Sequence, residues 1–401
     1  MKLNTSEFVD KSCIVTSLSQ WVFSSTSSDS KLKTYNVMKP IIPFALLGAL
    51  FAVGANAAVT DPVGYVTIPL PGTGGGAPQA LQVASQQLLP GGSTEFAGVA
   101  EGFGSDGSGT FLQDDDGTWA AGDFYNSTDS QFTSLVEITS GPLVGTLTWI
   151  TGSDVDKLYT FDDISAAGAD AGFKVIRAFT VSSLLGDVPT SDVLGGATSI
   201  SSADNFLLYN SAANAYTTFW YKTGGPGGVG WRSDDGSITN PAESPIHPVD
   251  SGIIFVRKQS AGGSLVIAGD VKTGVTDVVI RGGGGTGPSA TTLNIVQVPY
   301  PVDQLTPDNS GLYTGDPATG LAGATSISSA DSLLVFDSAT NSYTTFWYKT
   351  GGPGGIGWRS DDGSIADPAN QALSSTSAIL IQRKASGSDF TWAIPPVTIA
   401  P

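Results

Sequence analysis

The stretch KTGGPGGVGWRSDDGSI at residues 222–238 returns as KTGGPGGIGWRSDDGSI at residues 349–365, with a single Val-to-Ile change. The similarity extends beyond these seventeen residues. Residues 196–239 and 323–366 align without a gap, and 35 of the 44 positions are identical. A long internal repeat of this kind indicates that one structural module was duplicated. The rest of the chain can therefore be divided around the two copies.

Each copy has the pattern of a β-hairpin. DNFLLYN and YTTFWYK are two short apolar runs that flank a turn-like Ser-Ala-Ala-Asn-Ala segment within residues 204–222. In the second run Tyr216 and Trp220 share one face, while Phe219 and Tyr221 share the other. Large aromatic residues on both faces indicate that each face is covered, by a second layer or by a contact between modules. We therefore expect a mainly β fold of two tandem sandwich-like modules, preceded by a further β-rich region, with little helix.

The N-terminal part of the chain predicts export. Residues 38–57 begin with Met-Lys, continue as an apolar run and end in Ala-Asn-Ala, which is typical of a secretory signal peptide. The run is shorter than the ~20 residues that cross a bilayer. Residues 1–37 then form an extension, which either lies upstream of a true start at Met38 or belongs to a long leader. We expect a leader at residues 1–57 and no membrane span after its removal.

Three regions are expected after the leader: a β-rich region at residues 58–172, a first repeat module with a Gly-rich linker at 173–290, and a second module at 291–401. The segments FKVIRAFTVSSLLG, from Phe173, and LNIVQVPYPVDQL, from Leu293, look like equivalent openings of the two modules. Smaller elements are also predicted. These are a strand in residues 61–71, a hairpin in 134–152 with a Ser-Gly-Pro turn, one short helix in 160–173, and later strands in 251–258 and 263–269.

Charge and cysteine content exclude several classes of function. The chain carries a formal net charge of −18, so nucleic acid and anionic membrane surfaces would be repelled. Its single cysteine, Cys13, lies in the predicted leader, so the exported part has no thiol and no disulfide. Such a composition suits an oxidising compartment outside the cytoplasm. We expect a protein that is secreted or bound to the surface of a bacterium.

Several motifs support a resemblance to known sequences. They are VTDPVGYVTIPLPG directly after the predicted cleavage site, VEITSG, the duplicated YTTFWYKTGGPGG block with its GWRS, and NSGLYTG at residues 309–315. Together they resemble an uncharacterised family of exported bacterial proteins of unknown function, over nearly all of residues 58–401. The resemblance implies export and a shared β architecture. It carries no activity and no catalytic residue.

The repeated loop admits several kinds of site. It lacks the Gly-Lys-Ser/Thr ending of a phosphate loop, so an inter-strand turn is expected instead. Acidic residues on glycine turns, in RSDDGS of both copies and in QDDDGT at residues 113–118, make calcium a minority hypothesis. Otherwise no cofactor or metal is expected. The first candidates for calcium are Asp234, Asp235, Asp361 and Asp362.

The same loop holds a candidate carbohydrate site. In each copy a Trp precedes an Arg and the acidic pair, and an exposed ring stacked on a sugar is a common arrangement. A Trp that closes a glycine loop more often plugs the end of a sandwich core, and we expect that role here. The candidate ligand-binding residues are Trp231, Arg232, Asp234, Asp235, Trp358, Arg359, Asp361 and Asp362.

Catalytic signatures are scarce. His247 is the only histidine, it lies between two prolines, and the second copy has no counterpart. No Gly-x-Ser-x-Gly motif accompanies it. We therefore expect no enzyme and no catalytic residue. The leading hypothesis is a secreted or cell-surface structural or adhesive protein that contacts other copies of itself or surface glycans. The alternatives are a carbohydrate-binding protein with one site per module and a polysaccharide-acting enzyme with carboxylates in residues 58–172.

Overall fold

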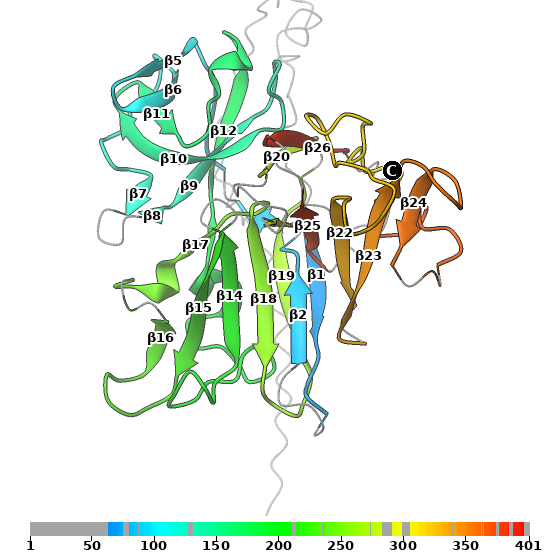
Figure 1. Cartoon of the computed structure of the whole chain (residues 1–401). Helices are drawn as coiled ribbons and strands as arrows, with labels where there is room; N and C mark the ends of the chain where they lie inside the picture. Colours follow the sequence, from blue (N-terminus) through cyan, green and yellow to red (C-terminus); the bar gives the residue numbers. More distant parts are fainter. Residues whose placement is uncertain are drawn as a thin grey trace, which may run out of the picture. The chain divides into compact units, whose positions relative to one another are not determined.

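The computed structural model shows a mainly β chain with 46% strand and 4% helix, as predicted (Figure 1). The predicted leader lies outside the described residues. None of the helices in the described part has the length and apolar composition of a membrane span. The structure describes residues 63–74, 80–86, 88–92, 94–126, 131–210, 214–234, 236, 238–272, 274–282, 291–298, 305–337, 340–361, 363, 365–373, 377–384 and 388–396.

The first repeat copy forms most of a five-stranded antiparallel sheet. The predicted hairpin is confirmed, because its two strands pair with Phe206 opposite Phe219. Asn214 enters the second strand with φ +48°, a left-handed conformation that Asn adopts more readily than most residues. The strand order is β16 (Gly230–Ser233), β15 (Ala215–Lys222), β14 (Asn205–Asn210), β18 (Ser251–Arg257) and β2 (Ala80–Ala84).

A second layer covers one face of this sheet. It has the order β1 (Val63–Leu70), β19 (Gly263–Asp270) and β3 (Leu89–Pro90). Burial alternates along β1, so that Val66, Ile68 and Leu70 point inward. The two layers therefore form a sandwich around one apolar core. Its members include Val66, Ile68, Leu70, Leu265 and Ile267 from the smaller layer and Phe206, Phe219, Tyr221, Trp231 and Phe255 from the larger.

The second copy repeats this arrangement. Its five-stranded sheet has the order β21 (Thr292–Val296), β25 (Ile379–Arg383), β22 (Ser332–Asp337), β23 (Ser342–Lys349) and β24 (Gly357–Ser360). The paired strands β20 (Thr276–Ile280) and β26 (Phe390–Ile394) contribute to the same apolar core. Figure 1 shows β22, β23 and β24 in orange. The core includes Val278, Ile280, Leu333, Phe346, Trp358, Ile381, Phe390 and Trp392.

Strand register shows which segments of the two modules correspond. β2 pairs with β18 so that Ala80 lies opposite Arg257. β21 pairs with β25 so that Thr292 lies opposite Arg383. Arg257 and Arg383 are equivalent residues of the repeat, so β2 and β21 hold the same place in the two sheets.

The expectation that Phe173 and Leu293 begin equivalent openings is therefore wrong. Phe173 lies in β12 (Gly172–Arg177), which pairs with β4 (Thr94–Val99) and β9 (Ser134–Ile138) in a separate sheet. Strand pairing also crosses both predicted boundaries. β2 and β1, from the predicted region 58–172, pair with strands of the first module, and β20, from the predicted first module, pairs with β26 of the second.

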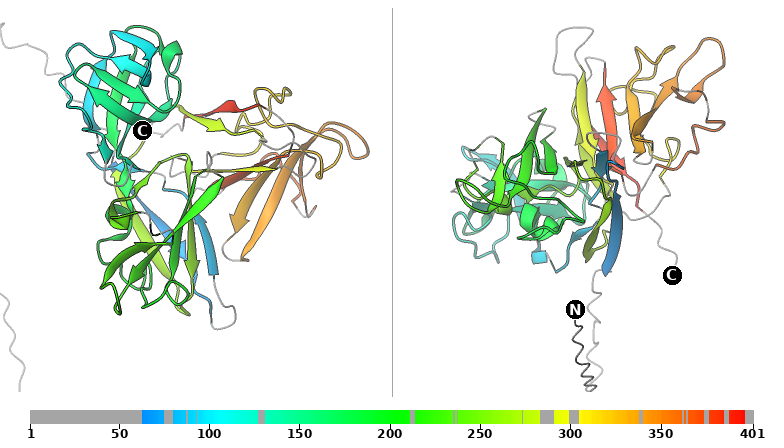
Figure 2. Two further views of the ribbon diagram at one scale, coloured as in Figure 1. Left: turned by 60° about the vertical axis from the view of Figure 1, so that its left-hand side comes forward. Right: turned by 90° about the horizontal axis from the view of Figure 1, so that it is seen from below.

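The chain between β2 and β14 holds a separate seven-stranded sheet, whose strands curl around their own core in Figure 2. The predicted hairpin in residues 134–152 is confirmed, because β9 pairs with β10. A 3₁₀ turn, η2 (Ser165–Ala167), stands where the short helix was expected. The strand order is β4, β12, β9, β10 (Leu147–Asp154), β11 (Lys157–Thr160), β6 (Gly109–Gln113) and β5 (Gly102–Asp106).

Short elements connect this sheet with the first module. Two small pairs of strands lie there, together with the helix α1 and a 3₁₀ turn. Thr180 caps α1, since its hydroxyl accepts a hydrogen bond from the Ser183 N–H at 3.1 Å. The elements are β7 (Tyr125–Asn126) with β8 (Gln131–Phe132), β13 (Phe179–Thr180) with β17 (Pro245–Ile246), α1 (Val181–Leu185) and η3 (Pro241–Glu243).

The two five-stranded sheets meet through a shared apolar cluster. It contains both members of two equivalent pairs, Val83 with Ile295 and Tyr209 with Phe336. The Tyr209 hydroxyl also donates to the Leu293 carbonyl oxygen at 2.6 Å. One face of each sheet thus packs inside its own sandwich and the other contributes to a contact between modules. The expectation that both faces of the repeated strand are covered is met only in part, because Tyr216 and Tyr343 remain 42% and 39% exposed.

Candidate functional sites

The repeated glycine loop is held by its own basic side chains. The Lys222 ammonium donates to the Pro226 carbonyl oxygen, and the Arg232 guanidinium donates to the carbonyl oxygens of Gly227 and Gly228. Arg232 also donates to the Trp231 carbonyl oxygen at 2.7 Å. These bonds hold both cationic side chains of the loop against its own backbone. The second copy makes the equivalent bonds from Lys349 to Pro353 and from Arg359 to Gly354, Gly355 and Trp358.

The glycines of the loop are required by its backbone. Gly225, Gly227, Gly228 and Gly230 have φ angles of +86°, +86°, +76° and +138°. The corresponding glycines of the second copy have nearly the same angles. Side-chain-bearing residues rarely adopt these conformations. The glycine run is therefore explained by the turn that it builds, in agreement with the expectation of an inter-strand turn.

The two tryptophans of the loops are core residues. Trp231 and Trp358 are each 4% exposed. The indole N–H of Trp231 donates to the Gly186 carbonyl oxygen at 3.1 Å, and its ring packs edge-on against Tyr221. A sugar platform needs an exposed aromatic face. Neither tryptophan has such an exposed face. A carbohydrate site built on these two rings, as the sequence suggested in its alternative, is therefore excluded.

The acidic residues of the loops have structural partners where they are described. The Asp234 carboxylate accepts a hydrogen bond from the Thr218 N–H at 2.9 Å, and the Asp234 N–H donates to the Thr218 carbonyl oxygen at 3.0 Å. Asp361 makes the same two bonds with Thr345. These carboxylates close the strand ladder next to the loop. Asp235 and Asp362 lie outside the described residues.

His247 is held as a structural residue. It is 7% exposed, and its Nδ1 accepts hydrogen bonds from the N–H groups of Val249 and Asp250. Its ring packs edge-on against Trp149 at a centroid distance of 5.2 Å. Burial lowers the pKa of His247 to about 3, so the ring is neutral at physiological pH. A buried ring whose Nδ1 is already occupied is poorly placed to act as a base.

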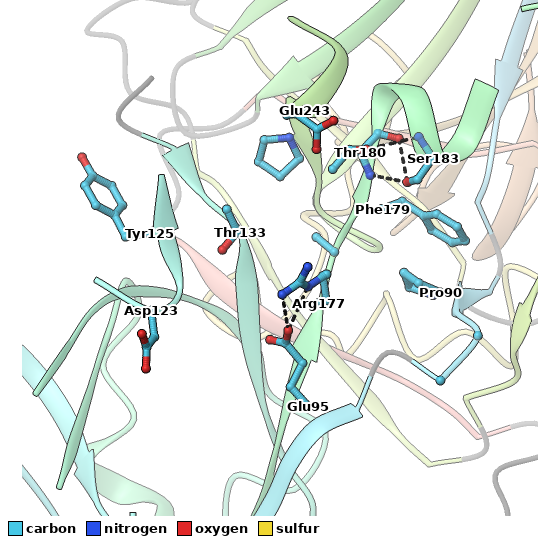
Figure 3. Close-up of a pocket in the computed structure, with 14 residues that line it drawn as sticks. Pro90, Glu95, Asp123, Tyr125, Thr133, Arg177, Phe179, Thr180, Ser183 and Glu243 are labelled. Atoms are coloured by element: carbon cyan, nitrogen blue, oxygen red, sulfur yellow. Dashed lines mark hydrogen bonds and ion pairs between the residues drawn. The ribbon is translucent and has the colours of Figure 1, made fainter. Parts of the chain in front are cut away.

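A cavity of about 780 Å³ lies between the seven-stranded sheet and the first module (Figure 3). Its volume suits a ligand of several rings. Its lining comes from β4, β12, the turn before β7, and the segment from β13 into α1. Pro245 of β17, Glu243 of η3, Thr133 and residues 90–92 also line it.

Carboxylates and hydroxyls converge on this cavity. Arg177 and Glu95 form an ion pair at 2.6 Å, and Glu95 also accepts from the Ser134 hydroxyl at 3.0 Å. Figure 3 shows this pair in the lining, with Asp123 and Tyr125 to one side of it. Asp123 and Glu243 add further carboxylates, so the lining is acidic overall and would repel anionic ligands. Neutral polyhydroxylated ligands match its mixture of acceptors and donors.

Sequence reasoning missed this cavity. Its lining residues are spread from residue 90 to residue 245 and share no motif. Only the folding of one sheet against the other brings them together.

The comparisons with known proteins give no further guide to function. No family model matches the chain, and no match is found among curated proteins or among solved structures. A function for the chain therefore follows only from its own geometry.

Proposed function

We propose that the protein is an exported, non-catalytic protein of the bacterial surface or surroundings, with a structural or adhesive role. The observation that carries this proposal is the pair of nearly identical loops, residues 222–233 and 349–360, which differ only at Val229 and Ile356. Each is fixed by the same lysine and arginine clamps and by glycines in the same conformations. A duplicated rigid loop supports repeated contact with a partner, whereas a catalytic centre gains little from duplication.

The part of each loop that is left for a partner is an aliphatic tip. Val229 is 61% exposed and its counterpart Ile356 is 67% exposed, while the neighbouring cations are engaged with backbone carbonyls. A loop that is already rigid loses little entropy when it binds. The aliphatic tips favour a protein partner, in the first place another copy of this chain.

The double substitution Val229→Asp with Ile356→Asp tests the adhesive role. Wild-type protein should self-associate in sedimentation velocity or bind a bacterial surface in an adhesion assay. The affinity of the double variant for itself or for the surface should be lower by a factor of about 100 or more, because linked sites act through effective concentration. Val188→Asp is the matched control, since Val188 is 69% exposed outside the repeated loop. Equal association of the double variant and wild type would reject the role of the loops.

The cavity supports a second candidate function, the binding of a neutral carbohydrate. Three carboxylates, the Thr133 and Ser183 hydroxyls and Tyr125 offer acceptors, donors and an aromatic ring within one space of about 780 Å³. Sugar recognition commonly combines these groups. These groups support a carbohydrate site in the cavity rather than at the buried tryptophans.

Glycan-array binding tests the second candidate. Asp123→Asn with Glu243→Gln should abolish a glycan signal that wild type gives, while Asp187→Asn, an exposed acid outside the cavity, should leave it intact. A glycan signal that the double variant retains would show that the cavity is not the binding site. Release of reducing sugar ends from a bound polysaccharide would favour the hydrolase alternative, although Glu95 is engaged with Arg177 and is not free to act as an acid.

A further inference from the structure

We propose that the seven-stranded sheet carries a binding site for a divalent cation, best suited to Ca²⁺, formed by Glu101, Asp114 and Asp116. One carboxylate oxygen of each residue lies within 4.8 Å of the others. Calcium binds oxygen at 2.3–2.6 Å, so two ligands of one ion can be at most about 5 Å apart. The three oxygens therefore meet the first geometric requirement of a shared ion.

Strand pairing brings these residues together. Glu101 directly precedes β5 and Asp114 directly follows β6, and these two strands pair with each other. The Glu101 N–H donates to the Gln113 carbonyl oxygen at 2.9 Å, and the Asp115 N–H donates to the Glu101 carboxylate at 2.9 Å. The group is thus positioned by a sheet and by a loop that folds over it, and not by flexible side chains alone.

The burial of Asp114 points independently to a ligand. Asp114 is 2% exposed, and its Oδ2 has no hydrogen-bond partner within the described part of the chain. Its other oxygen accepts from the Asp116 N–H at 3.0 Å. A buried carboxylate oxygen without a partner is costly, and a bound cation would satisfy it.

Charge balance supports the same assignment. Among the ion pairs of the described residues, none involves Glu101, Asp114 or Asp116. The acids of the repeated loops differ, because Asp234 is already satisfied by the Thr218 N–H. Three close carboxylates without a positive partner repel one another, and a divalent ion would relieve this repulsion.

The donor set selects the class of ion. All three side chains offer oxygen and none offers nitrogen or sulfur, which suits hard cations and disfavours zinc or copper. Calcium accepts six to eight ligands in irregular geometry and can complete its shell with water and carbonyl oxygens, whereas Mg²⁺ demands a near-ideal octahedron. An affinity of about 0.1–1 mM is expected, the range of extracellular calcium modules.

Calcium titration of the whole protein by calorimetry tests the site. Wild type should bind one Ca²⁺ in this range, and either Glu101→Gln or Asp116→Asn should weaken binding by about tenfold or more. Both side chains are exposed, so these variants should fold. Asp115→Asn is the matched control, because it removes the same charge from the same loop outside the group. Its binding should stay within about threefold of wild type.

Terbium luminescence gives a second readout. Trp119 packs onto this loop, because a Cβ at Gly117 would lie 2.7 Å from its ring. Excitation of tryptophan should therefore sensitise Tb³⁺ in wild type and in Asp115→Asn, and much less in Glu101→Gln and Asp116→Asn. Equal Ca²⁺ affinity of these two variants and wild type would overturn the proposal. So would an absence of binding up to about 10 mM Ca²⁺, well above the range of extracellular sites. A clear preference for Mg²⁺ would overturn the choice of ion.

Discussion

The Arg257 guanidinium lies 3.0 Å from the Asp204 carboxylate, and both side chains are almost completely buried. The same carboxylate accepts hydrogen bonds from the N–H groups of Gly195 and Lys258. The second module repeats the pair as Arg383 and Asp331 at 2.8 Å. In each module the aspartate lies directly before the repeated hairpin, and the arginine lies at the end of the strand that pairs with this hairpin. The ion pair therefore joins these two segments. A buried ion pair with these additional bonds is a structural clamp.

Loss of one partner of this clamp should be strongly destabilising. Asp204→Ala leaves the Arg257 charge buried without its counter-ion, so the free energy of unfolding should fall by about 3–5 kcal/mol. Guanidinium unfolding followed by tryptophan fluorescence measures this change. Arg177→Ala is the control, because the Arg177 side chain is 67% exposed and its ion pair should contribute no more than about 1 kcal/mol. A loss below about 1 kcal/mol for Asp204→Ala would show that the pair does not hold the module.

The burial of Trp231 predicts a large effect on stability. Trp231→Ala empties part of the first sandwich core and should lower the free energy of unfolding by about 3–5 kcal/mol. Val229→Ala, two residues away at the exposed tip of the loop, should change it by no more than about 0.5 kcal/mol. A Trp231→Ala variant with the stability of wild type would contradict the packing of this side chain in the core.

Two glycines of the same loop should respond oppositely to alanine. Gly228 has φ +76°, so Gly228→Ala should cost about 1–2 kcal/mol of stability. Gly224 has open space around its Cβ position and no positive φ, so Gly224→Ala should be neutral or stabilising by up to about 1 kcal/mol. Thermal or chemical unfolding of the two variants compares them directly. Equal effects would mean that the loop does not impose the left-handed conformation.

His247 should stay neutral well below its ordinary pKa. Burial lowers that pKa from 6.5 to about 3, so the unfolded chain binds a proton between pH 6.5 and 3 that the folded chain does not. Stability should therefore fall through this window as the pH falls, by about 1.4 kcal/mol per pH unit. The difference between wild type and His247→Asn isolates this contribution from that of the carboxylates. The chain has one histidine, so a single imidazole NMR signal reports its protonation directly. An imidazolium signal at pH 5 would contradict the burial.

The contact between the modules rests partly on the Tyr209 hydroxyl. It donates to the Leu293 carbonyl oxygen and is also 2.6 Å from the Asn214 side-chain oxygen. Tyr209→Phe should therefore cost about 1 kcal/mol, the value of a typical intramolecular hydrogen bond. The second module already has Phe336 at the equivalent position, so Phe336→Leu serves as a packing control without a hydroxyl. An unchanged unfolding midpoint for Tyr209→Phe would show that the hydroxyl does not link the modules.

Local elements were readable from the sequence because their signals lie within a few residues. Two short apolar runs on either side of a turn-like segment predicted β14 and β15, and the structure pairs them as a hairpin. Trp231 was expected to plug a core and is 4% exposed. The pairing of β1 with β19 could not be predicted from the sequence. The two strands are about two hundred residues apart, and no local sequence pattern indicates which distant strand will be the partner.

In the candidate sites, too, the sequence shows the local features, whereas the contacts between distant residues depend on the fold. Asp114 was visible only as part of an acidic turn, and its convergence with Glu101 depends on the pairing of β5 with β6. The cavity around Glu95 and Arg177 depends on two sheets whose residues share no motif.

The sequence by itself determined that the chain is mainly β, that one module occurs twice, and that the repeated glycine loop is a turn. These follow from periodicity, from near-identity and from the conformations that only glycine favours. Only the tertiary structure decided that β1 and β2 complete a module whose other strands follow a seven-stranded sheet. It also decided that the loop tryptophans are buried and that three carboxylates meet at Asp114. The physical reason is that strand partners and buried polar contacts are set by the packing of the whole chain, since any strand edge of suitable pattern offers the same hydrogen bonds.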